Sequence, residues 1–225
     1  MNPTHTISFR RTGDAFIPAY VSANGYETPV WLQGLWPDTE HAYYIRHNGC
    51  GHCCAAMAAR LHGVPDIDPL IEYGRCLALW GEPDDSHDHF ITARGITEAL
   101  ASFGVPSEAC GVPADAAGLA ALRRRIDRTL REGRQVIFWS HPKPRPDGSG
   151  TDNPFSTGEH YVMAVGYAAD GRILIANSGN RVTSDGAQLC DLNTVMDCLF
   201  AGCTAQLTGW GIGKRLPECG GIVFV

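Results

Sequence analysis

The chain has 225 residues, 44% of them hydrophobic and 19% charged, and its formal net charge is −6. This composition is typical of a globular protein with a substantial core, and the sequence has no linker or repeat, so we expect one domain over residues 1–225. The basic cluster at residues 123–125 shares a predicted helix with acidic residues. It offers no positive stripe for phosphates, and nucleic acid is not an expected partner.

The same features indicate where the protein resides. No run of about 18 apolar residues predicts a membrane span, and the first residues lack the basic and apolar regions of a signal peptide. Nine cysteines form an odd set in a chain that is long for a disulfide-stapled scaffold. We therefore expect reduced thiols and a cytoplasmic location.

The first thirty residues predict short strands or an extended arm, and residues 30–34 lead into a loop. The loop ends at Cys50, where a glycine-flanked turn enters an alanine-rich helix that Gly63 terminates. At a helix N-terminus, unpaired N–H groups and the helix dipole favour thiolate over thiol. Cys50 is thus a candidate nucleophile, whereas Cys53 and Cys54, one turn further, are expected to pack in the core.

The remaining elements change in type along the chain. Apolar residues at helical spacing predict helices over residues 67–80, 96–103 and 119–130. Runs of β-branched and aromatic residues predict strands over residues 135–139, 160–167, 172–176 and 221–225. The expected fold class is α+β, with an N-terminal helical half that carries the nucleophile, a C-terminal antiparallel sheet half, and a cleft between them.

The two central strands are joined by a short Asp-Gly turn typical of a hairpin. If Tyr167 pairs with Arg172, then Gly179 lies opposite His160, and Asn177 is the diagonal neighbour of His160 on the same face. Cysteine catalysis requires an imidazole that takes the thiol proton, and an amide or carboxylate that orients the imidazole. Cys50, His160 and Asn177 are therefore the predicted catalytic residues.

These residues resemble the papain-like cysteine peptidase superfamily, in the branch similar to the bacteriocin-processing (double-glycine leader) peptidases of bacteria and their stand-alone relatives. That pattern has Cys-Gly-Pro and a Met in a helix, a Gly-x-His strand that enters Gly-Tyr, and an Asp or Asn after the next strand. The matching stretches are residues 50–57, 158–167 and 176–178, and the resemblance spans roughly residues 30–225. Two residues depart from the pattern: His52 replaces the proline, and Asn177 is the papain-type choice where this branch more often has Asp.

The resemblance implies a papain-like fold and an oxyanion glutamine upstream of the nucleophile. Gln33 is the only glutamine before Cys50, so its side-chain amide and the Cys50 backbone N–H are the candidate oxyanion donors. The expected activity is that of a thiol hydrolase, which cleaves a peptide or amide bond through an acyl-enzyme thioester. An acyltransferase, a transpeptidase or a catalytically silent binding module on the same fold remains an alternative.

Two other readings use the same cysteines. Residues 50–53, Cys-Gly-His-Cys, match the redox motif of protein disulfide isomerases, but the segment before them is too polar for the buried strand that a thioredoxin fold needs. A zinc site would need a second separated pair of ligands, which neither another Cys-x-x-Cys nor His87 and His89 supply. We therefore expect no metal and no cofactor. Residues 142–158 are the most loop-like stretch of the chain, and we interpret the loop at residues 147–152 within it as a flexible flap beside His160.

Overall fold

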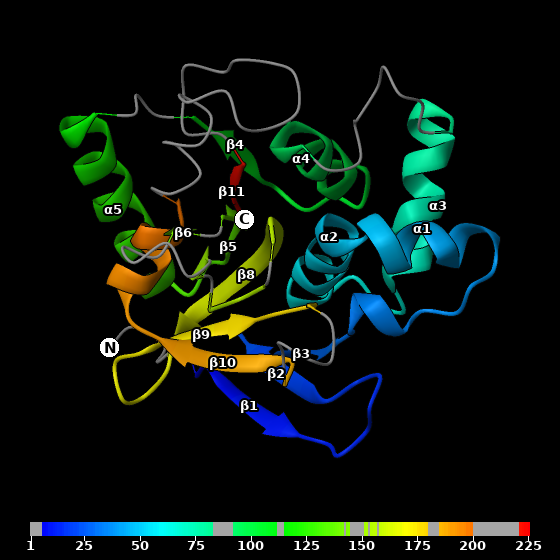
Figure 1. Cartoon of the computed structure of the whole chain (residues 1–225), viewed down its shortest axis with the longest axis horizontal. Coiled ribbons are helices and arrows are strands. Elements are labelled where there is room, and N and C mark those ends of the chain that lie inside the picture. Colours follow the sequence, from blue (N-terminus) through cyan, green and yellow to red (C-terminus); the bar gives the residue numbers. More distant parts are fainter. Residues whose placement is uncertain are drawn as a thin grey trace.

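The structure is a computed structural model, and it describes residues 6–82, 92–111, 115–141, 143–144, 151–152, 154–156, 158–179, 185–199 and 221–225. Over these residues the chain forms an α+β fold in which helices cover a central antiparallel sheet (Figure 1). The expected fold class is confirmed, with the nucleophile candidate in a helical half and the His and Asn candidates in an antiparallel sheet half. Among the described helices, none combines the length and the apolar character needed to cross a membrane.

The central sheet has six strands in the order β10-β9-β8-β5-β11-β4, and each neighbouring pair is antiparallel. Its strands are β4 (Glu108–Cys110), β5 (Val136–Ser140), β8 (His160–Tyr167), β9 (Ile173–Ala176), β10 (Ala187–Cys190) and β11 (Ile222–Phe224). Strand β8 lies inside this sheet and is buried along seven of its eight residues. Its first residue, His160, therefore comes at the end of a strand that both neighbours hold in place.

The helices are α1 (Glu40–Asn48), α2 (Cys50–Leu61), α3 (Pro69–Trp80), α4 (Ala93–Ser102) and α5 (Ala116–Arg131), with a further helical segment over residues 192–199. Successive side chains of β8 point alternately into two separate buried clusters. Tyr161 and Met163 join the cluster that contains α2, whereas Val162 and Ala164 join the one that contains α5. Figure 1 shows the corresponding layers, with α1 to α4 on one side and α5 on the other.

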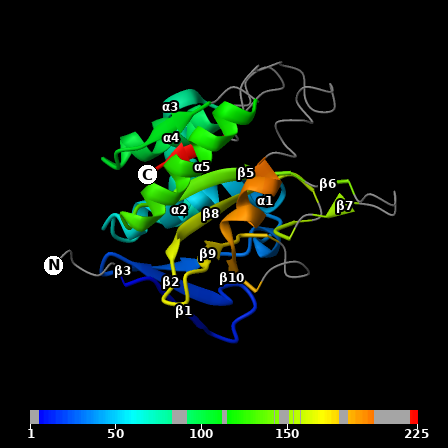
Figure 2. The same cartoon turned by 90° about the vertical axis from the view of Figure 1, so that its left-hand side faces the viewer.

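A three-stranded sheet precedes the helices and consists of β1 (Ser8–Arg11), β2 (Ala19–Ala23) and β3 (Tyr26–Val30). Figure 2 shows it as a separate layer beside the central sheet. Strand β3 packs on α2, which also packs on β8, so the helix that begins at Cys50 lies between the two sheets. A short pair, β6 (Lys143–Pro144) with β7 (Thr151–Asp152), forms part of the stretch expected to be loop-like, while residues 145–150 lie outside the described part.

Helix ends follow the signals in the sequence. Asp68 accepts a hydrogen bond from Ile71 N (2.8 Å) at the start of α3, and Asp115 caps α5 through Gly118 N (2.7 Å). Gly63, which follows α2, has φ of +83°, where a side chain would be strained, as expected for a C-terminal glycine cap. The predicted bounds of α2 to α5 therefore agree with the observed helices to within a few residues.

Several elements were not predicted, among them α1, β4 and β10. The segment before Cys50 is a helix, α1, and the expectation of a loop there is wrong; only Ala42 and Ile45 are buried along it, so its apolar period is weak. Strands β4 and β10 are short and lie at the two edges of the sheet, where few buried residues mark a strand. Pairing with the neighbouring strand, rather than local pattern, defines them.

The β8–β9 hairpin has the predicted strand pairing at its open end but a different pairing at its turn. Tyr167 pairs with Ile173, not with Arg172 as the short turn predicted, and the register then shifts by one residue at a bulge between Ala164 and Gly166. Beyond the bulge, Met163 pairs with Ala176, which restores the predicted offset at the open end of the hairpin. The turn register was wrong by one residue, and the bulge compensates for that difference.

Candidate active site

Helix α2 begins at Cys50, directly after Gly49, which separates it from α1. A side chain on Gly49 would overlap the backbone of Ile45, whose Cα lies 2.6 Å from the Cβ position, so only glycine fits between the two helices. Cys53 N donates to Gly49 O (2.8 Å), so the first helical hydrogen bond of α2 closes on that glycine. The close approach of the two helices sets where the thiol of Cys50 lies.

The sulfur of Cys50 lies against the start of β8, because the backbone N–H of Tyr161 donates to it. The Cys50 side chain is half-buried, and burial raises the pKa of its thiol above the ordinary value. The N–H groups of Tyr161, Gly51 and Cys50 lower this pKa, but by less than burial raises it. The helix N-terminus therefore acts in the expected direction, but burial outweighs it, and the net pKa of the Cys50 thiol lies above its ordinary value.

His160 and Asn177 are brought together as the sequence predicted. The Nε2 atom of His160 lies 3.0 Å from Oδ1 of Asn177, and both side chains are buried, with exposed fractions of 5% and 0%. Burial lowers the pKa of His160 to about 4, opposed by the hydrogen bond to Asn177. Ser140 on β5 donates through Oγ to the backbone oxygen of His160 (2.9 Å), which ties this residue to the neighbouring strand.

Gln33 lies in a 3₁₀ turn over Gln33–Leu35, just after β3. Its backbone N–H donates to the oxygen of Ser178 (2.9 Å), so the turn is joined to the residue that follows Asn177. Its Oε1 atom is buried and accepts no hydrogen bond from the described residues. A buried amide oxygen without a partner is uncommon in proteins.

Of the four candidates, His160 and Asn177 are joined directly, and the other two are each attached to a residue next to that pair. Asn177 binds His160 directly, and Gln33 is attached through its backbone to the following residue. Cys50 contacts the backbone of the residue next to His160, but among the interactions of the described chain no hydrogen bond joins its sulfur to the His160 ring. Proton transfer from Cys50 to His160 would therefore require closer approach of the sulfur and the ring than in this resting arrangement.

His52, which stands where the pattern of the similar peptidases has proline, makes a contact that the sequence did not reveal. His52 is buried on α2, and its Nδ1 contacts a carboxylate oxygen of Glu72 on α3, which is also buried. Cys76 donates through Sγ to the other oxygen of Glu72 (3.4 Å). A glutamate on the apolar side of a helix was the available signal, because a buried carboxylate needs a partner. The contact between His52 and Glu72 thus joins α2 to α3.

The same three residues form the group in the described chain that could hold a metal ion, with donor atoms within 4.8 Å of one another. Both oxygens of Glu72 already accept hydrogen bonds, from His52 and from Cys76. The interactions within the group are those of a closed hydrogen-bonded network. The histidines considered for zinc in the sequence, His87 and His89, lie outside the described residues.

Comparisons with known proteins give similarity in three dimensions but not in sequence. No family model matches the chain, and no curated protein matches it. Among solved structures, the chain is similar to a protein from Bacillus anthracis provisionally described as a C39-like peptidase, with 10% identity and a TM-score of 0.43. The match covers 80% of this chain and 89% of that protein. Similarity at this level concerns the course of the chain at a coarse level only.

Proposed function

We propose that the protein is a papain-like thiol hydrolase that cleaves a peptide or amide bond, with Cys50 as the nucleophile, His160 as the general acid and base, and Asn177 as the residue that orients His160. The observation that supports it is the buried His160–Asn177 pair at the end of β8, next to the residue whose N–H holds the Cys50 sulfur. Nucleophile, base and orienting amide are the three parts that such catalysis requires.

The pKa directions favour a neutral resting pair. Burial raises the pKa of Cys50 and lowers that of His160, so thiol and neutral imidazole are both favoured before substrate binds. In the proposed reaction the imidazole takes the thiol proton as the sulfur attacks the carbonyl carbon. The Cys50 backbone N–H and the Gln33 side-chain amide donate to the resulting oxyanion. The intermediate then collapses, and the leaving amine departs with the proton that the imidazolium returns.

The second half of the reaction resolves the thioester. A water molecule gives a proton to the neutral imidazole and attacks the acyl carbon, and the Cys50 sulfur leaves and takes that proton back. If an amine enters in place of water, the same steps give acyl transfer. The entering nucleophile therefore decides between hydrolase and transferase, and the proposal commits to water.

Thiol–disulfide exchange is less well supported by the arrangement around α2. A thioredoxin-type motif follows a strand of a parallel sheet, whereas α2 follows α1, and each neighbouring pair in the described central sheet is antiparallel. Cys53 is 0% exposed, and burial raises the pKa of its thiol well above the ordinary value. His52, the third residue of the motif, binds Glu72. A resolving thiol in this position would be both inaccessible and protonated.

A peptidyl acyloxymethyl ketone, an electrophile that reacts with activated thiols, tests the proposal by mass spectrometry of the intact protein. We expect one adduct, on Cys50, that is lost in Cys50→Ala and in His160→Ala and retained in Cys53→Ala. Hydrolysis of fluorogenic peptide amides should follow the same pattern, with Cys53→Ala costing stability on the order of 1 kcal/mol. Loss of all activity in folded Cys53→Ala, with a mixed disulfide trapped at Cys50, would instead establish thiol–disulfide exchange.

A further inference from the structure

The side-chain amide of Asn177 has a fixed orientation. Its Oδ1 accepts from the backbone N–H of Gly179 (2.8 Å), and its Nδ2 donates to the backbone oxygen of Phe155 (2.9 Å). A backbone N–H can only donate and a carbonyl can only accept, so turning the amide over would place two donors and two acceptors against each other. In this structure the oxygen therefore faces His160, and the hydrogen bonds of the amide together hold it in that orientation.

This orientation fixes the tautomer of the imidazole. Because Oδ1 of Asn177 can only accept, the Nε2 atom of His160 must carry the hydrogen that joins them. In the neutral ring the other nitrogen, Nδ1, then has the free lone pair. Nδ1 is thus the proton acceptor in the proposed reaction, and the contacts of Asn177 decide whether it is available.

The second Nδ2 hydrogen of Asn177 is directed at Gln188, on the edge strand β10. The Oε1 atom of Gln188 lies 3.1 Å from Nδ2, and the Nε2 atom of Gln188 donates to the backbone oxygen of Pro154 (3.4 Å). Gln188 therefore connects Asn177 to the segment that also supplies the Phe155 carbonyl. Gln188 pairs in register with Ile175, two residues before Asn177, so the sheet itself sets its reach.

We propose that Gln188 is a positioning residue of this site: with the Phe155 carbonyl it makes position 177 specific for an amide, and through Asn177 it holds His160 with its hydrogen on Nε2. An aspartate at position 177 would direct a carboxylate oxygen at two acceptors, the Phe155 carbonyl and the Gln188 oxygen. That explains why this chain carries Asn where the similar enzymes more often carry Asp. The inference rests on the proposed function for its importance in catalysis, but not for its effect on the His160 ring.

The charges around Gln188 are neutralised locally. Gln188 lines an open cavity of about 360 Å³ that Arg11, Arg172 and Asp185 also line. Arg11 pairs with Asp185 (2.9 Å), and Arg172 pairs with Asp170 (2.6 Å). Cys190, also on β10, lines the same cavity, and burial raises the pKa of its thiol to about 12, so it stays neutral. Because these groups are paired with one another or neutral, a formal charge introduced at position 188 would be the main change in charge near Asn177.

Among the described residues near His160, the titratable groups include Cys50, the preceding residue Glu159, and His141 on the chain after β5. Glu159 pairs with Nδ1 of His141 (3.4 Å), and burial lowers the pKa of His141. Cys50 stays a thiol because burial raises its pKa. These groups are unchanged by substitution at position 188, so a shift in the titration of His160 in Gln188→Met would arise through Asn177, whereas in Gln188→Glu the added charge also acts on the imidazolium directly.

The test uses the full chain with Gln188→Met, which removes the acceptor, and Gln188→Glu, which keeps it and adds a negative charge. Leu189→Met, on the same strand, is the matched control. Nitrogen-15 NMR of the His160 ring reports tautomer and pKa, and iodoacetamide alkylation of Cys50 across pH reports the function of the base. We expect Gln188→Met to mix the two ring tautomers and to slow alkylation about fivefold, the equivalent of one lost hydrogen bond. We expect Gln188→Glu to keep the Nε2–H form and to raise the pKa of His160.

Ring spectra and titrations of both variants that match those of the unsubstituted protein would overturn the inference. If Gln188→Met does not fold, Gln188→Glu carries the test alone, because it preserves the acceptor. Failure of the proposed function is recognised separately. If His160→Ala leaves alkylation of Cys50 unchanged, the base assignment fails, while a shift of the ring tautomer in Gln188→Met still supports the positioning role.

Discussion

The backbone N–H of Tyr161 is directed at the sulfur of Cys50, so helix α2 meets the sheet one residue from His160. This contact, together with its partial exposure, distinguishes Cys50 from Cys53, Cys54 and Cys76. Cys53, Cys54 and Cys76 are buried, and burial raises their thiol pKa values. We expect iodoacetamide near neutral pH to modify Cys50 first in the folded protein, as peptide mapping would show. Faster modification of Cys53 or Cys54 would refute the assignment of Cys50.

Removal of the His160 imidazole should slow the alkylation of Cys50. We expect His160→Ala to reduce the alkylation rate of Cys50 at neutral pH by tenfold or more, because general-base assistance typically contributes about a hundredfold or more to a proton transfer. His62→Ala is the control, since His62 lies at the other end of α2 and bonds only the backbone oxygen of Ala58 (3.0 Å). Equal rates in the two variants would mean that His160 and Cys50 do not meet in solution.

Protonation of His160 should couple to stability. Its pKa is lowered from 6.5 to about 4 in the folded protein, so the unfolded chain binds the proton more readily. The stabilisation from the neutral ring is complete above about pH 6.5 and is lost as the pH falls through the window between about 6.5 and 4. Urea denaturation at several pH values should show this loss, and His160→Gln should lack that part of it. The same slope in both proteins would place the titration elsewhere.

The buried pair of His52 and Glu72 predicts non-additive stability changes. His52→Leu leaves a buried carboxylate short of a partner and should lower the free energy of unfolding by about 2–4 kcal/mol. Glu72→Leu should cost a similar amount. The double variant should lose clearly less than the sum, because two apolar side chains can replace a buried polar pair. Simple additivity in urea denaturation would show that the two side chains do not interact, and chelators should leave all four proteins unchanged.

We expect a single methyl group added at the α1–α2 junction to lower the stability of the protein. Gly49→Ala would place a Cβ against the Ile45 backbone, so the two helices must separate. We expect a loss of stability of about 1–3 kcal/mol, as for overpacking elsewhere, together with slower alkylation of Cys50. Gly74→Ala on α3 is the control, since a Cβ there meets nothing within 4 Å. A stable Gly49→Ala protein with unaltered Cys50 reactivity would contradict the role given to this junction.

The sequence predicted those parts of the site that local signals encode. Gly63 marked the end of α2, and the β-branched runs marked β8 and β9, so the nearness of His160 and Asn177 followed from a hairpin. Gln188 was not predicted, because it reaches Asn177 from an edge strand whose pairing no local pattern encodes. The pKa of Cys50 was misjudged because the helix dipole is visible in sequence, whereas desolvation depends on the whole fold.

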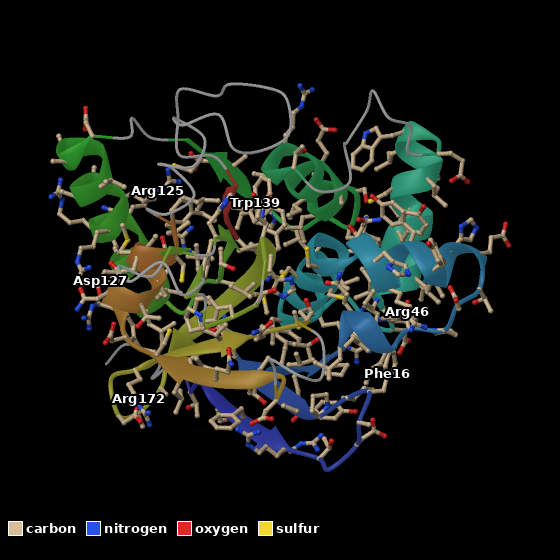
Figure 3. All side chains as sticks on the ribbon, in the orientation of Figure 1. Phe16, Arg46, Arg125, Asp127, Trp139 and Arg172 are labelled. Atoms are coloured by element: carbon tan, nitrogen blue, oxygen red, sulfur yellow. The ribbon has the colours of Figure 1, made fainter. Side chains whose placement is uncertain are left out.

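Figure 3 labels Arg172, beside the turn of the β8–β9 hairpin and far along the strands from His160. Between these two points lies the bulge at Val165, and it links the length of the turn to the identity of the residue that meets the histidine. If the turn were one residue shorter and the bulge were also lost, the two changes in register would cancel and His160 would keep Asn177 as its partner. If the bulge alone were lost, a neighbour of Asn177 would lie beside His160 instead. Turn and bulge therefore form a pair of compensating insertions, and relatives of this chain with shorter turns should have regular strands.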